Sequence, residues 1–208
     1  MPRTRVEALK HLKRVDPHLY AHTSPHHTSL PTQLRAKRTR AQLFESLIST
    51  VISQQLGLAA ADAIFARVKK VCEDRLTPES VMRVQPATLR KAGLSGTKIK
   101  TLKEIAKAVR SNSLDLFSLK KIPETEATEK LMRVWGLGPW SAEMFLMFAL
   151  GKSDVFSPGD LGLIRAMETI YGLPKSVPRS TLLAIAEKWS PHRTYASLLL
   201  WRTRDSKK

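Results

Sequence analysis

Apolar residues recur along most of the chain at intervals of three and four, the spacing that places them on one face of an α-helix. The clearest stripe begins at Ala41 and consists of Leu43, Phe44, Leu47, Ile48, Val51 and Ile52. Similar stripes predict helices over residues 60–71, 99–109, 124–135, 161–170 and 195–201, and Thr77-Pro78 predicts the start of another. We find no convincing run of alternating apolar and polar residues, the mark of a half-buried strand. The predicted fold class is therefore all-α.

One predicted helix is apolar on nearly every side. From Ala142 to Leu150 every residue except Glu143 is apolar, which predicts a buried helix, although one far too short to cross a bilayer. Gly136-Leu137-Gly138-Pro139 breaks the chain sharply before it, because glycine permits left-handed backbone angles and proline cannot continue a helix. Ser157-Pro158-Gly159-Asp160 predicts a turn after it.

Residues 16–41 interrupt the helical pattern and predict a connecting arm, with three prolines, four histidines and no sustained apolar period. A metal site at His26-His27 is disfavoured, because adjacent side chains point in different directions and no cysteine or acidic partner lies nearby in the sequence. The arm closes with the basic residues Arg35, Lys37, Arg38 and Arg40, which either form a solvated charge run or contact phosphates.

The chain is strongly basic. Its 208 residues include 35 Lys and Arg against 18 Asp and Glu, a formal net charge of +17, and the sequence pI is about 10.4. This excess favours a polyanionic partner, with nucleic acid ahead of an anionic membrane. The single cysteine, Cys72, excludes a disulfide or a cysteine-ligated metal cluster within one chain. We expect an intracellular protein, since the sequence has no signal-peptide core and no membrane-spanning apolar run.

A Gly-x-Gly turn between two helices directs backbone N–H groups and a helix N-terminus toward one point, a geometry that binds phosphate oxygens. Gly136 and Gly138 would then let a DNA backbone approach closely. The alternative interpretation is a simple corner between two helices.

The longer motifs resemble the alkylpurine (3-methyladenine) DNA glycosylases of the helix-hairpin-helix superfamily. The similarity extends from about residue 40 to 202 and rests on five segments: Ile52-Ser53-Gln54-Gln55-Leu56, Gly93-Leu94-Ser95, residues 136–145, residues 154–160, and residues 195–202.

The resemblance implies a compact two-lobed helical bundle with a cleft between the lobes. After an N-terminal segment and arm (1–40), a glycosylase core (41–208) is expected. It divides into a first lobe (about 41–125), a hairpin and catalytic region (about 126–172) and closing helices (about 173–208).

The resemblance places the family's catalytic aspartate at Asp160. A carboxylate held ionised at a helix N-terminus would stabilise the positive charge that develops on the sugar when a base is removed. An Asp before Leu161 would also cap the following helix, and that role alone would explain the residue. The two roles can coexist.

Bifunctional members of the superfamily carry an attacking lysine where this chain has Trp140. An indole cannot form a Schiff base, so the resemblance implies a monofunctional enzyme that uses water and leaves an abasic site. Trp140 is also the leading candidate for a π surface against cationic alkylated purines, ahead of Trp135 and Phe44. A core role is the favoured interpretation of Phe145, Phe148 and Trp201.

Further DNA contacts are implied at Gly136, Leu137 and Gly138 of the hairpin, and at the turn of Gln54, Gln55 and Leu56, where the family inserts a wedge into the duplex. Lys98 and Lys100 are further candidates, on a helix face that Lys103 and Lys107 share. The family hairpin binds a monovalent cation, here Na⁺ or K⁺, through backbone carbonyls that fall on Met132, Val134 and Leu137. No cofactor is expected for catalysis, and a monomer acting on damaged double-stranded DNA is expected.

Two rival interpretations remain open. A protein that binds abasic or distorted DNA without excising a base would share the basic surface and the hairpin. A glycosylase with another specificity, such as oxidised purines or mismatched pyrimidines, would share the fold, although the missing lysine and missing cluster cysteines count against several such relatives.

Overall fold

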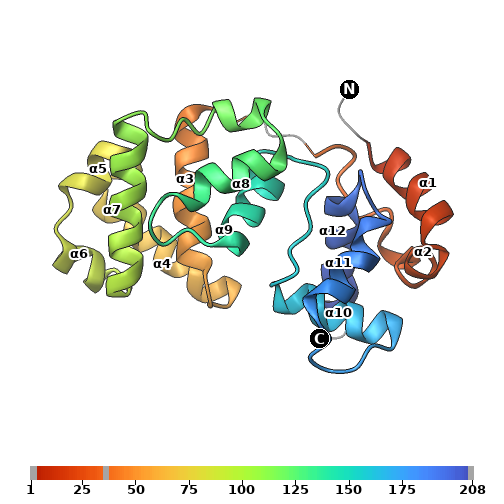
Figure 1. Cartoon of the computed structure of the whole chain (residues 1–208). Helices are drawn as coiled ribbons and strands as arrows, with labels where there is room; N and C mark the ends of the chain where they lie inside the picture. Colours follow the sequence, from red (N-terminus) through yellow and green to blue (C-terminus); the bar gives the residue numbers. More distant parts are fainter. Residues whose placement is uncertain (1–3, 35–37, 206–208) are drawn as a thin grey trace. The chain divides into compact units, whose positions relative to one another are not determined.

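Helices account for the regular structure of residues 4–34 and 38–205, the part of the chain that the computed structural model describes (Figure 1). Among these residues there is no β-strand, only an isolated bridge between Thr4 and Gln33. Every described helix falls short of the length or the apolarity that a membrane-spanning helix requires. The all-α prediction is confirmed, while Arg35 and Lys37 of the predicted basic run lie outside the described residues.

Contacts within the chain divide it into two units, which we call the central unit (residues 36–150) and the terminal unit (residues 1–35 and 151–208). The family resemblance implies a different division, with a first lobe that ends near residue 125. In the structure the hairpin belongs to the central unit, and the N-terminal segment packs with the C-terminal helices. Packing between segments far apart in the sequence leaves no periodic signal, so the pattern of apolar residues cannot locate this boundary.

The N-terminal segment contains two helices that the sequence analysis does not predict. Helix α1 (Arg5–Val15) begins after a capping Thr4, and helix α2 (Pro17–His22) begins after Asp16. The region predicted as an irregular arm therefore starts with ordered turns, α2 and the 3₁₀ helix η1 (Ser24–His26). Six residues of α2 are too few to reveal an apolar period, although the Asp-Pro start is itself a helix signal.

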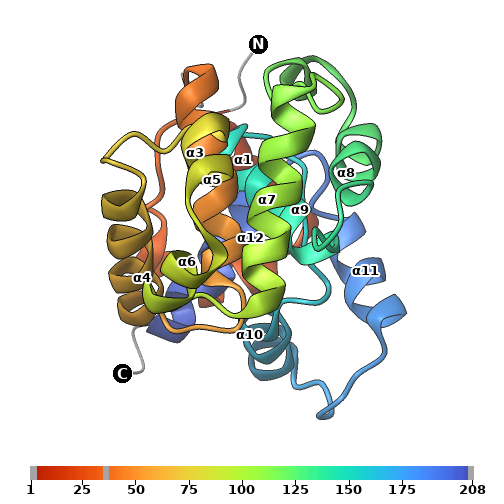
Figure 2. The same ribbon diagram turned by 90° about the vertical axis from the view of Figure 1, so that its left-hand side faces the viewer.

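The central unit is built around helix α3 (Arg40–Ser53), which buries all six residues of the predicted apolar stripe. Helix α7 (Gly96–Arg110) packs beside α5 (Pro78–Arg83), as Figure 2 shows. The remaining helices of this unit are α4 (Leu58–Val71), α6 (Pro86–Lys91), η2 (Ser118–Lys121), α8 (Glu124–Met132) and α9 (Pro139–Met144).

A π-helical turn, η3 (Phe145–Ala149), continues α9. The Leu150 N–H donates to the Phe145 carbonyl, five residues earlier, at 3.1 Å. Phe148 is 51% exposed whereas Phe145 is buried, so the predicted core role is confirmed for Phe145 and wrong for Phe148. The wider π turn changes which side chains face the core, and an almost uniformly apolar sequence does not reveal that change.

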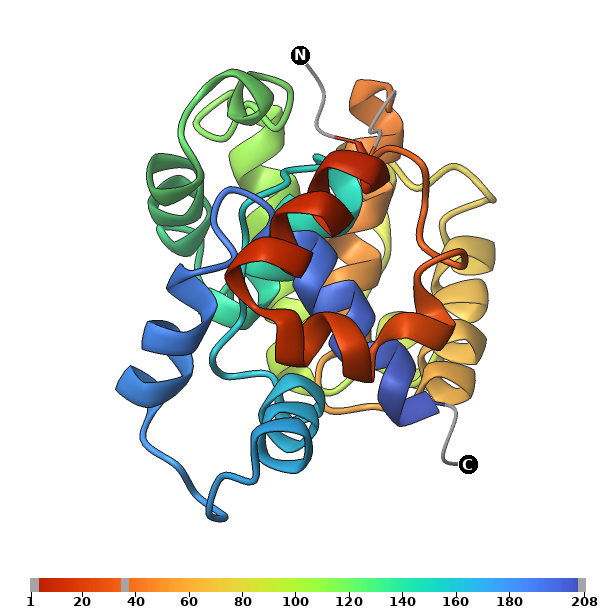
Figure 3. The ribbon, with the colours of Figure 1, turned by 90° about the vertical axis from the view of Figure 1, so that its right-hand side faces the viewer.

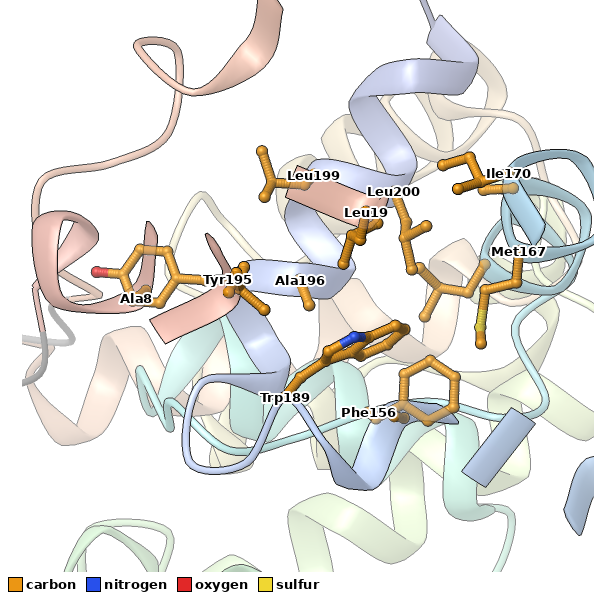
Figure 4. Close-up of a cluster of buried hydrophobic side chains, with 14 of the residues drawn as sticks. Ala8, Leu19, Phe156, Met167, Ile170, Trp189, Tyr195, Ala196, Leu199 and Leu200 are labelled. Atoms are coloured by element: carbon orange, nitrogen blue, oxygen red, sulfur yellow. The ribbon is translucent and has the colours of Figure 1, made fainter. Parts of the chain in front are cut away.

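The terminal unit combines α1 and α2 with α10 (Leu161–Tyr171), α11 (Arg179–Glu187) and α12 (Arg193–Asp205). Helix α12 packs against both α10 and α1 (Figure 3). Figure 4 shows the core of this unit, where the rings of Phe156 and Trp189 meet edge to face with their centroids 5.7 Å apart. Phe156 therefore anchors the loop before α10 in a well-packed core.

A buried carboxylate joins the N-terminal helices to the rest of this unit. Asp16 is 7% exposed and accepts hydrogen bonds from the Leu19 N–H at 2.9 Å, the Tyr171 hydroxyl at 2.6 Å and the Trp189 indole N–H at 2.8 Å. Burial and the Asp16 carboxylate raise the pKa of Tyr171 far above its ordinary value, so the phenol remains a donor.

Candidate active site and nucleic-acid interface

The loop that leads to Asp160 is fixed to the start of α12. Asp154 accepts hydrogen bonds from Arg193 Nε at 2.8 Å and Nη2 at 3.1 Å, and from the Ser190 hydroxyl at 2.9 Å. Burial raises the pKa of Asp154, but the bonds from Arg193 and Ser190 outweigh that effect and hold the pKa below its ordinary value. The ionised carboxylate is therefore a stable anchor at neutral pH.

Thr194 provides a second anchor for the same loop. Its N–H donates to the Ser153 carbonyl at 3.0 Å, and its hydroxyl donates to the Lys152 carbonyl at 2.8 Å. The hydroxyl also accepts the Val155 N–H at 3.1 Å. These bonds fix the first part of the loop that leads to Asp160.

Asp160 is the N-cap of α10. Its Oδ1 accepts the Leu163 N–H at 2.9 Å, which confirms the predicted capping geometry. The same oxygen accepts the indole N–H of Trp201 at 2.9 Å. Two donors therefore orient the carboxylate at the N-terminus of α10.

Trp201 is a candidate site residue that could not be recognised from the sequence. It is only partly buried and donates directly to the candidate catalytic carboxylate, whereas a core role is the sequence-based interpretation. A signal was available, because a tryptophan indole that is removed from water needs an acceptor. The sequence alone does not identify that acceptor, since Trp201 and Asp160 lie 41 residues apart.

The hairpin between α8 and α9 uses its two glycines differently. Gly136 has a φ of +85°, and a Cβ on it would lie 2.0 Å from Oγ1 of Thr101 on α7, so both backbone conformation and packing require glycine. Gly138, the N-cap of α9, has a φ of −97°, and none of the described residues lies within 4 Å of its Cβ position. The space beside this helix N-terminus is open to a phosphate group.

The turn between α3 and α4 presents exposed side chains next to this hairpin helix. Gln55 has a φ of +57°, and both Gln55 and Leu56 are exposed. Gln54 faces inward instead, and its Nε2 donates to the Ser141 hydroxyl on α9 at 2.6 Å. The structure thus separates the three predicted contact residues into one that fixes the turn and two that a duplex could reach.

Lys98 supports the same turn from α7. Its Nζ donates to the carbonyls of Ile52 at 2.7 Å and Gln54 at 2.8 Å, and burial lowers the pKa of its ammonium group. The C-terminal carbonyls of α3 are thereby satisfied. Its predicted phosphate contact remains a prediction, but these two hydrogen bonds give Lys98 a role in positioning the turn between α3 and α4.

The other lysines of α7 differ from one another. Lys100 is exposed, and its Nζ lies 4.0 Å from the ring centroid of Trp135, which is 45% exposed. Lys103 donates to the carbonyls of Met82 at 2.8 Å and Val84 at 2.7 Å at the end of α5. The expectation that Lys103 belongs to a solvated or DNA-facing stripe is therefore corrected, because its ammonium group is occupied within the central unit.

The described part of the basic run also makes internal contacts. Arg40 forms an ion pair with Asp115 and lies over the ring of Phe117, with its guanidinium carbon 5.2 Å from the ring centroid. Arg38 donates to the Ser46 hydroxyl. Both side chains thus have partners in the protein, and phosphate contact by either one remains a prediction.

The family comparison matches residues 48–191 to the HhH-GPD superfamily of base excision DNA repair proteins. The chain belongs to this superfamily. The match includes the hairpin, the Asp160 loop and α10, which are the elements described above.

Curated relatives place the chain among the alkylpurine DNA glycosylases of the HhH-GPD superfamily. DNA-3-methyladenine glycosylase 1 of Schizosaccharomyces pombe is 34% identical over 163 residues, covering 77% of this chain and 72% of the relative. DNA-3-methyladenine glycosylase 2 of Escherichia coli is 27% identical over 175 residues, covering 77% of this chain and 57% of the relative. The chain thus spans little more than half the length of the E. coli relative.

Solved structures of HhH-GPD glycosylases have the same fold. The Schizosaccharomyces pombe 3-methyladenine DNA glycosylase, solved in complex with abasic DNA, matches with a TM-score of 0.81 and 30% identity, covering 96% of this chain and 97% of that one. DNA-3-methyladenine glycosidase from Bacillus halodurans matches with a TM-score of 0.77 and 34% identity, covering 94% and 88%. These matches confirm the fold class and the family resemblance.

The candidate aromatic surfaces of this HhH-GPD protein are not equivalent. Trp140 lies in the first turn of α9 and is partly exposed. Phe44 is 1% exposed within α3, which favours its alternative interpretation as a core residue. Trp135 contacts Lys100 through its ring. Trp140 therefore remains the leading candidate for a base surface.

The carbonyls predicted to hold a cation lie where the chemistry suits one. Met132 is the last residue of α8, and Val134 and Leu137 follow in the hairpin. The C-terminal end of a helix carries partial negative charge, and carbonyl oxygens suit hard cations. The Val134 carbonyl also accepts the Leu137 N–H at 3.1 Å, which fixes the curvature of this turn.

Proposed function

We propose that this protein hydrolytically removes alkylated purines of the 3-methyladenine and 7-methylguanine type from double-stranded DNA and leaves an abasic site. The observation that carries the proposal is the setting of Asp160, which is held by the Leu163 N–H and the Trp201 indole at the N-terminus of α10. We expect the protein to act inside the cell as a monomer, without a membrane partner.

The reaction breaks the bond between the base nitrogen and C1′ of the sugar. The alkylated base is cationic before cleavage and leaves neutral with the bonding electron pair, so positive charge develops on the sugar. The carboxylate of Asp160 stabilises that charge, and water adds its oxygen to C1′ while its proton passes to the carboxylate or to solvent. Trp140 offers an aromatic face to the cationic base, and it has no amine that could attack the sugar.

The central unit supplies the candidate contacts to the duplex. Gly136, Leu137 and Gly138 would bind a phosphate at the hairpin, and a monovalent cation on the Met132, Val134 and Leu137 carbonyls would add positive charge there. Gln55 and Leu56 would fill the gap that a flipped nucleotide leaves. Their exposure on a turn that Gln54 and Lys98 hold fixed supports this role.

Single-turnover incubation with a duplex that contains one 7-methylguanine tests this function, with chromatography of the released base. Release of free base at a rate above spontaneous depurination supports it, and tight binding without release would instead indicate a non-catalytic lesion-binding protein. A panel of 3-methyladenine, ethenoadenine, hypoxanthine and uracil then defines specificity. Borohydride trapping tests the monofunctional assignment, since a covalent adduct in good yield would require an attacking amine.

A further inference from the structure

Two glycines on either side of Asp160 leave room for arginine side chains from other helices. A Cβ on Gly159 would lie 2.8 Å from Nη2 of Arg179, the first residue of α11. A Cβ on Gly162 would lie 3.1 Å from Nη1 of Arg204 on α12 and 2.9 Å from Oδ1 of Asp160. The candidate catalytic carboxylate thus has a guanidinium group near it on each side along the chain.

Backbone conformation does not explain these glycines. Positive φ angles occur at Gly93, Gly136, Gly151 and Gly172, but Gly159 and Gly162 are not among them. Gly162 also lies in the first turn of α10, where alanine would favour the helix. Glycine at position 159 leaves space for the Arg179 guanidinium group. Glycine at position 162 leaves space for the Asp160 carboxylate and the Arg204 guanidinium group, and also for the Trp201 ring, whose Cδ1 would lie 3.1 Å from a Cβ.

Both arginines are exposed, and within the described residues neither forms an ion pair. The positive surface continues beyond Arg204 into a pocket of about 530 Å³ along one face of α10. Its polar and charged lining residues are His22, His26, Arg165, Thr169, Thr203 and Arg204. No carboxylate lines this pocket among the described residues, whereas the two other large pockets include Glu104 and Asp115, or Glu45.

We propose that Arg179 and Arg204 bind the two phosphates that flank the excised nucleotide, and that the pocket beyond Arg204 receives the next phosphate of the same strand. This inference rests on the proposed function, because it takes Asp160 as the group next to the reacting sugar. A sugar in a DNA strand carries one phosphate through O5′ and another through O3′. A carboxylate that faces C1′ is therefore accompanied by two nearby phosphates, and guanidinium groups match phosphate oxygens in charge and geometry.

In this proposal, the positions of Gly162, Arg165 and Thr169 along α10 define the path of the bound DNA strand. Gly162, Arg165 and Thr169 lie on one face, and successive turns carry them about 5 Å further along the helix axis each time. A strand that passes from Arg179 over Asp160 to Arg204 would then reach Arg165 and the histidines in the pocket. The terminal unit thus contributes a phosphate track of its own, in addition to the hairpin of the central unit.

The test combines arginine variants with neutral phosphates in the DNA. Arg179→Gln, Arg204→Gln and Arg165→Gln are compared with Arg14→Gln, an exposed arginine on α1 that serves as the matched control. The probe is a fluorescent duplex with a tetrahydrofuran abasic site, in which single phosphates near that site are replaced by methylphosphonates. Binding is measured by anisotropy over a range of salt concentrations.

Each of the three variants is expected to weaken binding roughly tenfold and to lower the salt slope by about one, while Arg14→Gln changes neither. A methylphosphonate at one flanking position should weaken binding by the wild type and the Arg179 variant, but should have no further effect on the Arg204 variant. A methylphosphonate at the other flanking position should weaken binding by the wild type and the Arg204 variant, but should have no further effect on the Arg179 variant. If the effects of the arginine variants and of the methylphosphonates on binding are additive at every position, or if the variants do not change the salt slope, the proposal is wrong.

This experiment does not depend on catalysis. If the wild type excises methylated bases but the phosphate replacements are additive, the phosphate track is wrong and the proposed function survives. If the replacements couple to the arginines but no base is released, the track survives as a binding site and the enzymatic function fails. Unfolding curves for each variant exclude a general loss of structure.

Discussion

Asp160 is the N-cap of α10 and the proposed electrostatic partner of the sugar, and these two roles can be separated by chemistry. One of its oxygens accepts both the Leu163 N–H and the Trp201 indole N–H. A capping oxygen needs only to accept a hydrogen bond, whereas stabilising a cationic sugar requires negative charge. An uncharged residue of the same shape therefore keeps the first role and loses the second.

Asp160→Asn is expected to leave folding intact and to slow base release by at least roughly 100- to 1,000-fold, because the charge opposite the sugar is lost. Single-turnover rates on methylated duplex measure the effect. Affinity for abasic DNA and the thermal midpoint serve as controls and should change little. Near wild-type excision by the well-folded variant would sink the catalytic assignment.

At the residue scale, the sequence predicted roles that depend only on neighbouring residues, but not roles that depend on which element a side chain faces. The turn before α10 predicted the cap at Asp160, which depends only on neighbouring residues. Lys98 and Lys103 looked like surface lysines, yet both donate to carbonyls of other elements. A lysine on an amphipathic helix has the same pattern whether it faces solvent or a neighbouring helix end.

At the scale of elements, the hairpin owes its shape to Gly136 and its accessibility to Gly138. A Cβ at Gly136 would collide with Thr101, while one at Gly138 would meet open space among the described residues. From the sequence alone, glycine at both positions was explained by a close approach of the DNA backbone. Packing within the central unit already requires Gly136, so only at Gly138 does a close approach to DNA remain the sole predicted reason for glycine.

The two glycines should therefore respond differently to alanine. Gly136→Ala is expected to destabilise the fold by roughly 1–3 kcal/mol or more, because the new methyl group needs a left-handed backbone and meets Thr101. Gly138→Ala should leave stability nearly unchanged and weaken binding to abasic DNA, because its methyl group would occupy the space expected for a phosphate. Urea unfolding and fluorescence anisotropy separate the effects; equal DNA affinity for Gly138→Ala and wild type would contradict the phosphate site.

Asp16 tests how α1 and α2 depend on the terminal unit. Asp16→Ala leaves the Tyr171 hydroxyl and the Trp189 indole N–H without their carboxylate acceptor, so we expect a loss of about 2–4 kcal/mol in the free energy of unfolding. Urea denaturation measures the loss. Glu126→Ala is the control, since its pair with Lys130 is exposed on both sides and should contribute less than about 0.5 kcal/mol. Similar losses for both variants would show that the buried carboxylate contributes no more than a surface pair.

Across the whole molecule, sequence patterns predicted most of the long helices but missed α1, of eleven residues, and the shorter α2 and α6. The stripe of α3 is buried as predicted, whereas α2 and α6, of six residues each, have too few turns to show a period. The pairing of residues 1–35 with 151–208 and the contact of Trp201 with Asp160 depend on tertiary packing. Neither leaves a local signal in one sequence.

The net charge of +17 is a property of the entire chain, and it predicts strong salt dependence of DNA binding because bound phosphates release condensed counterions.

Two lysines of α7, Lys100 and Lys103, test the salt dependence at single residues. Lys100 is exposed, and its ammonium group lies over the ring of Trp135, next to the hairpin. Lys100→Gln should therefore lower the slope of DNA binding against salt concentration by about one if Lys100 contacts a phosphate. Lys103→Gln should keep the wild-type slope and reduce stability instead, because its ammonium group is bound to the Met82 and Val84 carbonyls. Anisotropy titrations between about 50 and 200 mM salt, paired with thermal melts, measure both effects. An unchanged salt slope for Lys100→Gln would mean that Lys100 faces solvent and does not contact a phosphate. A reduced salt slope for Lys103→Gln would mean that the Lys103 ammonium group contacts DNA.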